Sequence, residues 1–255
     1  MTEEIIFEVK QGIATLRFNR PQARNALNWA AQERFAATIA AAAEDETIRA
    51  LILTGSDRAF VSGGDLKELA AGDFEAHGER LSRIMSGALA QMTRLPVPVI
   101  AAVNGHAAGG GCEILLACDL RLAAAEARLD FAQVRLGLTT GWGGAARLNA
   151  LVGRSRAMEI LLRGRTLTAQ EAQAMGLVNG VVADGEDVLQ AAQAWAEELA
   201  ALPREALAAM KQLLLAMPEL DEQETAALER RLFVQLWGQP AHRRALAAFL
   251  GTSVE

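Results

Sequence analysis

The chain has no tyrosine, and only two cysteines and three histidines occur among its 255 residues. Without tyrosine, no phenol of this chain can act as a general acid or donate to an oxyanion. Two cysteines are too few for a disulfide framework or a zinc-ribbon site, and three histidines give metal catalysis poor odds. We therefore expect no metal site.

Basic residues are also scarce, because 25 Lys and Arg face 31 Asp and Glu for a net charge of −6. This balance argues against nucleic acid or a polybasic membrane surface as the main partner. No stretch approaches the roughly 18 consecutive apolar residues that a bilayer span requires. Residues 1–6 are acidic and enter an alternating pattern at once, unlike a signal peptide. We expect a cytoplasmic protein with no nucleic-acid and no membrane partner.

A composition of 51% hydrophobic and 22% charged residues can bury a full core. Hydrophobic periodicity and turn residues predict strands and helices that alternate to about residue 185. The expected strands are 5–9, 13–18, 50–54, 97–103, 120–123, 129–131 and 178–182. The expected helices are 28–43, 77–92, 113–118, 145–151, 155–162 and 168–175, followed by an Ala/Leu/Glu-rich helical part after 186. We expect a mixed α/β fold, with a core over residues 1–195 and a helical region over 196–255.

Two glycine-rich loops, residues 60–67 and 104–113, are the strongest candidates for chemistry. Gly63-Gly64-Asp65 precedes a predicted helical turn, and Gly109-Gly110-Gly111 precedes a helix predicted from Cys112. Glycine lets a backbone approach a ligand closely, and a helix N-terminus presents free N–H groups. Two such loops facing each other would form an oxyanion hole, in which each donor is worth about 2.7–4 kcal/mol. Either loop alone is more typical of a simple turn than of a binding site.

Other chemistries fit these loops poorly. Neither loop matches the glycine pattern of a dinucleotide or P-loop site, and Ser62 lacks the Gly-x-Ser-x-Gly elbow of hydrolases. Glu113 falls in the first turn of the second predicted helix, where a carboxylate alone would merely complement the helix dipole. Beside an oxyanion loop, Glu113 becomes a candidate acid–base group.

A series of segments carries a family resemblance. The segments are 19–27 (NRPQARNAL), 59–67 (AFVSGGDLK), 98–113 (PVIAAVNGHAAGGGCE), 136–138, 143–148, 164–172 and 176–178. In this order they resemble the crotonase (enoyl-CoA hydratase/isomerase) superfamily. The resemblance implies a crotonase/ClpP-like spiral of β-β-α turns with a C-terminal helical oligomerisation region that builds trimers, often paired into hexamers.

The resemblance also implies a lyase or isomerase that stabilises the enolate of an acyl-CoA thioester. The thioester oxygen would lie between the N–H groups of Gly64 and Gly110, and Glu113 would handle protons. The residues implied to line the CoA path are Ala23, Arg24, Asp65, Leu66 and Lys67, with Arg24 near the phosphates. The resemblance implies no separate cofactor, because CoA is part of the substrate.

One position departs from the family pattern. Hydratases of this family carry a second glutamate twenty positions after the first, and this chain has Gln133 there. A carboxamide cannot exchange a proton near neutral pH, so Gln133 can only position substrate or water. A single carboxylate therefore fits isomerisation or decarboxylation better than hydration.

Residues 136–144 (LGLTTGWGG) and 237–241 (WGQPA) are similar to the ethylmalonyl-CoA decarboxylase branch, which also lacks the second glutamate. Trp142 would then border the substrate, although plain packing explains it equally well. Alkylmalonyl-CoA (ethylmalonyl- or methylmalonyl-CoA) decarboxylation and enoyl-CoA hydration stay equally open, with isomerisation third. A non-catalytic member that binds acyl-CoA or RNA is the rival from another class.

Overall fold

The computed structural model describes residues 3–69 and 73–251. Its strands are β1 (Ile5–Lys10), β2 (Ile13–Phe18), β3 (Ala50–Gly55), β4 (Val99–Val103), β5 (His106–Ala108), β6 (Leu120–Ala123), β7 (Arg128–Asp130), β8 (Thr166–Thr168) and β9 (Gly180–Val181). Its α-helices are α1 (Trp29–Glu44), α2 (Leu66–Leu69), α3 (Phe74–Thr93), α4 (Gly110–Leu116), α5 (Gly144–Val152), α6 (Arg154–Leu162), α7 (Ala169–Ala174), α8 (Val188–Ala200), α9 (Arg204–Ala216), α10 (Glu222–Leu236) and α11 (Pro240–Leu250).

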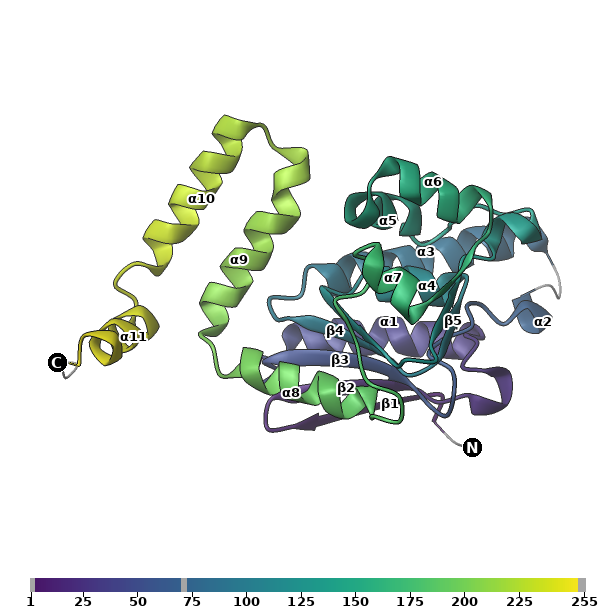
Figure 1. The fold of residues 1–255 in the computed structure, drawn as a ribbon, viewed down its shortest axis with the longest axis horizontal. Helices are drawn as coiled ribbons and strands as arrows, with labels where there is room; N and C mark the ends of the chain where they lie inside the picture. The colour runs from purple at the N-terminus through teal and green to yellow at the C-terminus, as the bar shows by residue number, and fades with distance from the viewer. Residues whose placement is uncertain (1–2, 70–72, 252–255) are drawn as a thin grey trace.

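The larger sheet has six strands in the order β1-β2-β3-β4-β6-β9 (Figure 1). β1 and β2 form the predicted hairpin, whose turn has positive φ at both Gln11 and Gly12, as the twist of a two-residue hairpin requires. The other neighbouring strands are parallel. Every residue of β3 and β4 is buried, which explains why these strands read as continuous apolar runs.

The smaller sheet, β5-β7-β8, stands next to the carboxyl end of β4. Its first strand, β5, begins three residues after the end of β4, and α4 begins two residues after the end of β5. An isolated bridge pairs Ala59 with His106, and another pairs Leu27 with Gly64. The two glycine loops therefore lie between the sheets.

Helices close the core around the larger sheet. α8 packs on β2, β3, β4 and β6, while α1 packs on α3. One hydrophobic cluster runs from Ile5 to Ala196, with Leu199 and Ala200 packed at its margin. No helix of the described residues is long and apolar enough to cross a membrane.

The last three helices form an arm that projects from this core (Figure 1). None of the buried residues of the main cluster lies in α9, α10 or α11. The arm is anchored by Lys211 of α9, whose Nζ donates to Asp119 Oδ2 at 2.6 Å and to the Val97 carbonyl at 3.0 Å. The expected mixed α/β fold with C-terminal helices is confirmed. The division expected at residue 195 falls inside α8 and stays a prediction.

Several helix and strand boundaries in the structure differ from those predicted from the sequence. The strand expected over 178–182 shortens to β9, because the Arg121 N–H donates to the side-chain oxygen of Asn179 at 2.9 Å instead of to a backbone carbonyl. The helix expected from Cys112 begins two residues earlier, at Gly110. β5 and β8 were not expected, since three-residue strands depend on partners that are remote in sequence.

Candidate active site

The two glycine loops lie against each other. A β-carbon on Gly63 would lie 3.2 Å from the backbone nitrogen of Gly110, and one on Gly111 would lie 1.8 Å from the Val61 carbonyl oxygen. The Ala108 N–H also donates to Val61 at 2.9 Å. Only residues without a side chain allow this approach.

Two amides at this contact are unpaired within the part of the chain that the structure describes. In the bridge at Leu27, the Leu27 N–H donates to the Gly63 carbonyl at 2.8 Å, and the Asp65 N–H donates to the Leu27 carbonyl at 2.9 Å. The N–H of Gly64, which lies between them in sequence, has no acceptor among the described residues. Gly110 opens α4, so its N–H has no intrahelical partner. Both glycines are half-buried.

Two asparagine side chains fix the turn over residues 55–59, which leads into the first loop. Asn25 Nδ2 donates to the carbonyls of Ser56 (3.0 Å) and Ala59 (2.7 Å). Asn104 Nδ2 donates to the carbonyls of Asp57 (2.9 Å) and Ala59 (3.2 Å), and its Oδ1 accepts from the Gly55 N–H at 2.9 Å. The carboxamides thus satisfy backbone groups that a strand would otherwise pair.

Glu113 lies one turn into α4 and is 3% exposed. Its Oε2 accepts from the backbone N–H groups of Trp142 and Gly144, both at 2.8 Å, and its Oε1 accepts from the Gly141 N–H at 3.2 Å. A β-carbon on Gly144 would lie 2.6 Å from Glu113 Cγ. The loop before α5 therefore holds one carboxylate oxygen tightly and the other loosely.

Gln133 meets Glu113 at the looser oxygen. It opens the short 3-10 helix Gln133–Leu136 and is 8% exposed. Its Nε2 donates to Glu113 Oε1 at 3.4 Å, while its own Oε1 is buried without a partner among the described residues. The structure brings together the two side chains that lie twenty positions apart in the sequence.

Trp142 contacts Gly110 through its ring and Glu113 through its backbone N–H. Its ring is 4% exposed and packs on Gly110, where a β-carbon would lie 2.1 Å from Cζ3. Its carbonyl accepts from Arg147 Nη1 at 2.8 Å. Burial lowers the pKa of Arg147, against the influence of the Glu113 charge. The sequence did not point to Arg147 or to the backbone donors of residues 141–144, although the glycines of that segment were a signal.

The predicted CoA-path residues surround the first loop. Ala23 and Arg24 are next to it, since their carbonyls accept from Ser62 Oγ and Ser62 N, each at 3.2 Å. Arg24 is exposed and left-handed, with φ of 50°. Leu66 and Lys67 lie exposed on α2.

Among the predicted CoA-path residues, Asp65 has a side chain that forms an ion pair within the protein. Its Oδ2 pairs with Arg20 Nη1 at 3.0 Å, so its carboxylate ties the loop to the chain before α1.

Other titratable groups near Glu113 do not bond to it. The Cys112 thiol donates to the Ala107 carbonyl at 3.4 Å, and burial raises its pKa well above the ordinary value. Burial lowers the pKa of the half-buried His106. The described residues contain no group of three His, Cys, Asp or Glu placed to hold a metal ion. Glu113 is therefore the carboxylate that the structure places next to Gln133 and the loop before α5.

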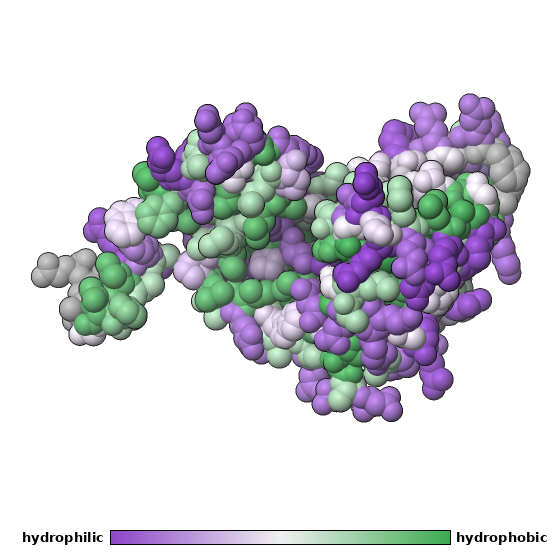
Figure 2. All heavy atoms as spheres, turned by 45° about the horizontal axis from the view of Figure 1, so that its top comes forward, coloured by the Kyte–Doolittle hydropathy of each residue, from purple (hydrophilic) through white to green (hydrophobic). Residues whose placement is uncertain are grey.

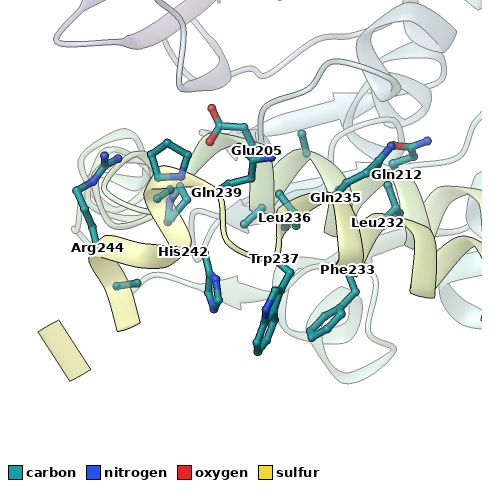
Figure 3. A pocket seen from close by; sticks show the side chains of 17 residues that line it. Glu205, Gln212, Leu232, Phe233, Gln235, Leu236, Trp237, Gln239, His242 and Arg244 are labelled. Atoms are coloured by element: carbon teal, nitrogen blue, oxygen red, sulfur yellow. The ribbon is translucent and has the colours of Figure 1, made fainter. Parts of the chain in front are cut away.

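A groove of about 850 Å³ lies elsewhere, between α9, α10 and α11 (Figure 3). Phe233, Trp237 and His242 point to the same side of it (Figure 3), with ring centroids 5.2 Å and 4.6 Å apart. None of the glycine-loop residues, nor Glu113, lines this groove.

Known proteins resemble the chain over nearly its full length. The family model described as enoyl-CoA hydratase/isomerase matches residues 8–253. The chain is 38% identical to the 2,3-dehydroadipyl-CoA hydratase of Escherichia coli (strain K12), with 97% of this chain and 95% of that one covered. It is 33% identical to the short-chain-enoyl-CoA hydratase of Clostridium acetobutylicum, with 96% and 94% covered. An enoyl-CoA hydratase structure from Mycobacterium smegmatis superposes with a TM-score of 0.92 at 32% identity, with 100% and 99% covered.

Proposed function

Since this chain belongs to the enoyl-CoA hydratase/isomerase family and therefore acts on an acyl-CoA thioester, we propose that it adds water to the double bond of a 2-enoyl-CoA. The observation that carries the proposal is the pair of unpaired amides at Gly64 and Gly110 beside the buried carboxylate of Glu113. The names of the similar hydratases support the same reaction.

The proposed chemistry divides between the two loops. The N–H groups of Gly64 and Gly110 donate to the thioester oxygen and stabilise the negative charge that it gains as the enolate forms. Glu113 exchanges protons with water and with the carbon next to the thioester. Ala23, Arg24, Leu66 and Lys67 border the CoA, and the guanidinium of Arg24 pairs with phosphate.

A second candidate is decarboxylation of an alkylmalonyl-CoA. Gln133 favours it, because loss of carbon dioxide yields the same enolate and requires only one proton, which Glu113 can deliver. The segment that contains Trp142 was similar to that branch of the family in sequence. The hydratase relatives at 33–38% identity favour hydration over this alternative.

The two candidates are separated by their products. Purified enzyme incubated with crotonyl-CoA is expected to form 3-hydroxybutyryl-CoA, and with ethylmalonyl- or methylmalonyl-CoA to release no carbon dioxide, measured by chromatography of the thioesters. Carbon dioxide release without hydration would establish the decarboxylase instead. Tight binding of acyl-CoA without turnover of any thioester would leave a non-catalytic binding protein.

The arm also supports a proposal about assembly. Large apolar side chains are exposed along it (Figure 2), including Phe233 (60%), Trp237 (62%) and Phe249 (86%). Several large apolar side chains exposed on one part of a protein mark an interaction surface. We propose that second and third copies of the chain cover the arm in a homotrimer or a dimer of trimers. The cytoplasmic location stays a prediction.

Replacing Phe233 and Trp237 together by aspartate is expected to shift the enzyme to smaller species, because buried unpaired charges oppose an apolar interface. Sedimentation equilibrium measures the change. Glu229→Gln, at an exposed position of the same helix outside the groove, is the matched control and should keep the parental mass. A double variant of unchanged mass would show that these aromatics face no other copy.

A further inference from the structure

The unpartnered carboxamide oxygen of Gln133 lies at the acid–base group and has no role in the fold. A buried acceptor left without a hydrogen bond destabilises the fold, because its desolvation is not compensated. The amide orientation is fixed, because turning it would place Oε1 rather than Nε2 next to the Glu113 carboxylate at 3.4 Å. An acceptor retained at this cost beside a reactive group indicates a ligand that donates to it.

The two oxygens of Glu113 are also unequal. Oε2 accepts two backbone bonds of 2.8 Å, whereas Oε1 accepts weaker ones of 3.2 Å from Gly141 and 3.4 Å from Gln133. Longer hydrogen bonds are weaker and more easily exchanged. Oε1 is therefore the oxygen that is free to take and release a proton, and it lies next to the unpartnered oxygen of Gln133.

We propose that Gln133 is a positioning residue that accepts one hydrogen bond from the attacking water, while Glu113 Oε1 alone carries out both proton transfers of the hydration. A neutral donor, water or the 3-hydroxyl of the product, satisfies Gln133 Oε1. A substrate carboxylate offers no proton to it. The inference rests on the proposed function and explains how that function operates without a second carboxylate.

Both proton transfers of the hydration can take place at Glu113 Oε1. Water forms a bond to C3 and gives its proton to Glu113 Oε1, while the π electrons of the double bond move to C2 and the thioester oxygen. The N–H groups of Gly64 and Gly110 hold the enolate oxygen. Glu113 then returns its proton to C2, and the carbonyl re-forms. The product carries hydrogen at C2 and hydroxyl at C3 on the same face, and the carboxylate is regenerated.

In the described part of the chain, the other titratable groups near Glu113 make no hydrogen bond to it, because its carboxylate accepts only from Gln133 and from the backbone of residues 141, 142 and 144. Arg147 on α5 stays a cation, and the Cys112 thiol on α4 stays protonated because burial raises its pKa. Asp130 on β7 lies near both Cys112 and His106 of β5, and neither Asp130 nor His106 bonds to Glu113.

The test compares wild type with Gln133→Leu and Gln133→Glu on two reactions. Hydration of crotonyl-CoA needs a positioned water, whereas exchange of the C2 hydrogen of butyryl-CoA in D₂O needs only the amides and Glu113. Gln133→Leu is expected to lower kcat for hydration about 10- to 100-fold, with KM nearly unchanged. The exchange rate should fall several-fold less, because exchange loses only the 3.4 Å bond from Gln133 to Glu113 and needs no positioned water. Its melting temperature should be equal or higher, because an unpaired buried polar group is removed.

Gln133→Glu is expected to keep an acceptor and add an acid. A second acid–base group next to Glu113 can take over one of the two proton transfers, so hydration should rise about tenfold. Equal loss of hydration and exchange in Gln133→Leu, or undiminished hydration, would overturn the role of Gln133. A wild-type enzyme that exchanges the C2 hydrogen but adds no water would reject the hydration itself.

Discussion

Replacing Glu113 by glutamine should lower kcat for crotonyl-CoA hydration by about 10²–10⁴-fold, the usual contribution of a positioned acid–base group. A carboxamide keeps the size of the side chain but cannot accept and return a proton near neutral pH. The three backbone donors around the carboxylate also lose one acceptor, since an NH₂ group must face either Gly141 or Trp142 and Gly144. We therefore expect the free energy of unfolding to fall by about 1–3 kcal/mol as well.

Stopped-flow measurement of thioester absorbance gives the rate, and urea unfolding gives the stability. Glu126→Gln, an exposed position, is the matched control and should change neither quantity. If Glu113→Gln retained more than about a tenth of kcat, another group would have to move the protons.

Replacing Gly110 by alanine should affect the fold and the reaction together. The new β-carbon would lie 2.1 Å from Trp142 Cζ3, closer than two carbons can approach, so the ring must move. Overpacking of this kind costs about 1–3 kcal/mol. Because the backbone N–H of Trp142 holds Glu113, the movement displaces the carboxylate as well as the Gly110 amide. We expect kcat/KM to fall by at least about 10²-fold.

Two further variants separate steric from chemical causes. Gly87→Ala lies on α3 with nothing within 4 Å of its β-carbon, and it should gain about 0.5–1 kcal/mol from helix propensity without losing activity. Adding Trp142→Leu to Gly110→Ala removes the ring and should restore most of the lost stability. Wild-type stability and activity in Gly110→Ala alone would mean that the ring does not lie where the structure places it.

The sequence predicts those parts of the fold that local pattern determines. The β1–β2 hairpin, the buried strands β3 and β4, and the capping box at Thr168 all follow from neighbouring residues, and all are present. Glycine spacing likewise indicates the two loops, and the structure places them in contact.

The remainder depends on contacts between distant residues. The Arg20 partner of Asp65 lies 45 positions away, and the backbone donors of Glu113 lie 28 to 31 positions away. Residue type alone does not reveal such pairs, because a carboxylate on a loop is equally compatible with solvent, a ligand or a distant arginine. For the same reason, the sequence does not predict that the two carboxylate oxygens of Glu113 accept hydrogen bonds of unequal length.

The carboxamides of Asn25 and Asn104, which bond to the backbone of the turn before the loop that carries Gly64, do not ionise at any pH at which the protein is folded. These hydrogen bonds therefore stay unchanged when neighbouring acids and bases gain or lose charge. A change of pH can loosen the attachment of the loop at the Asp65–Arg20 ion pair but not at the two asparagines.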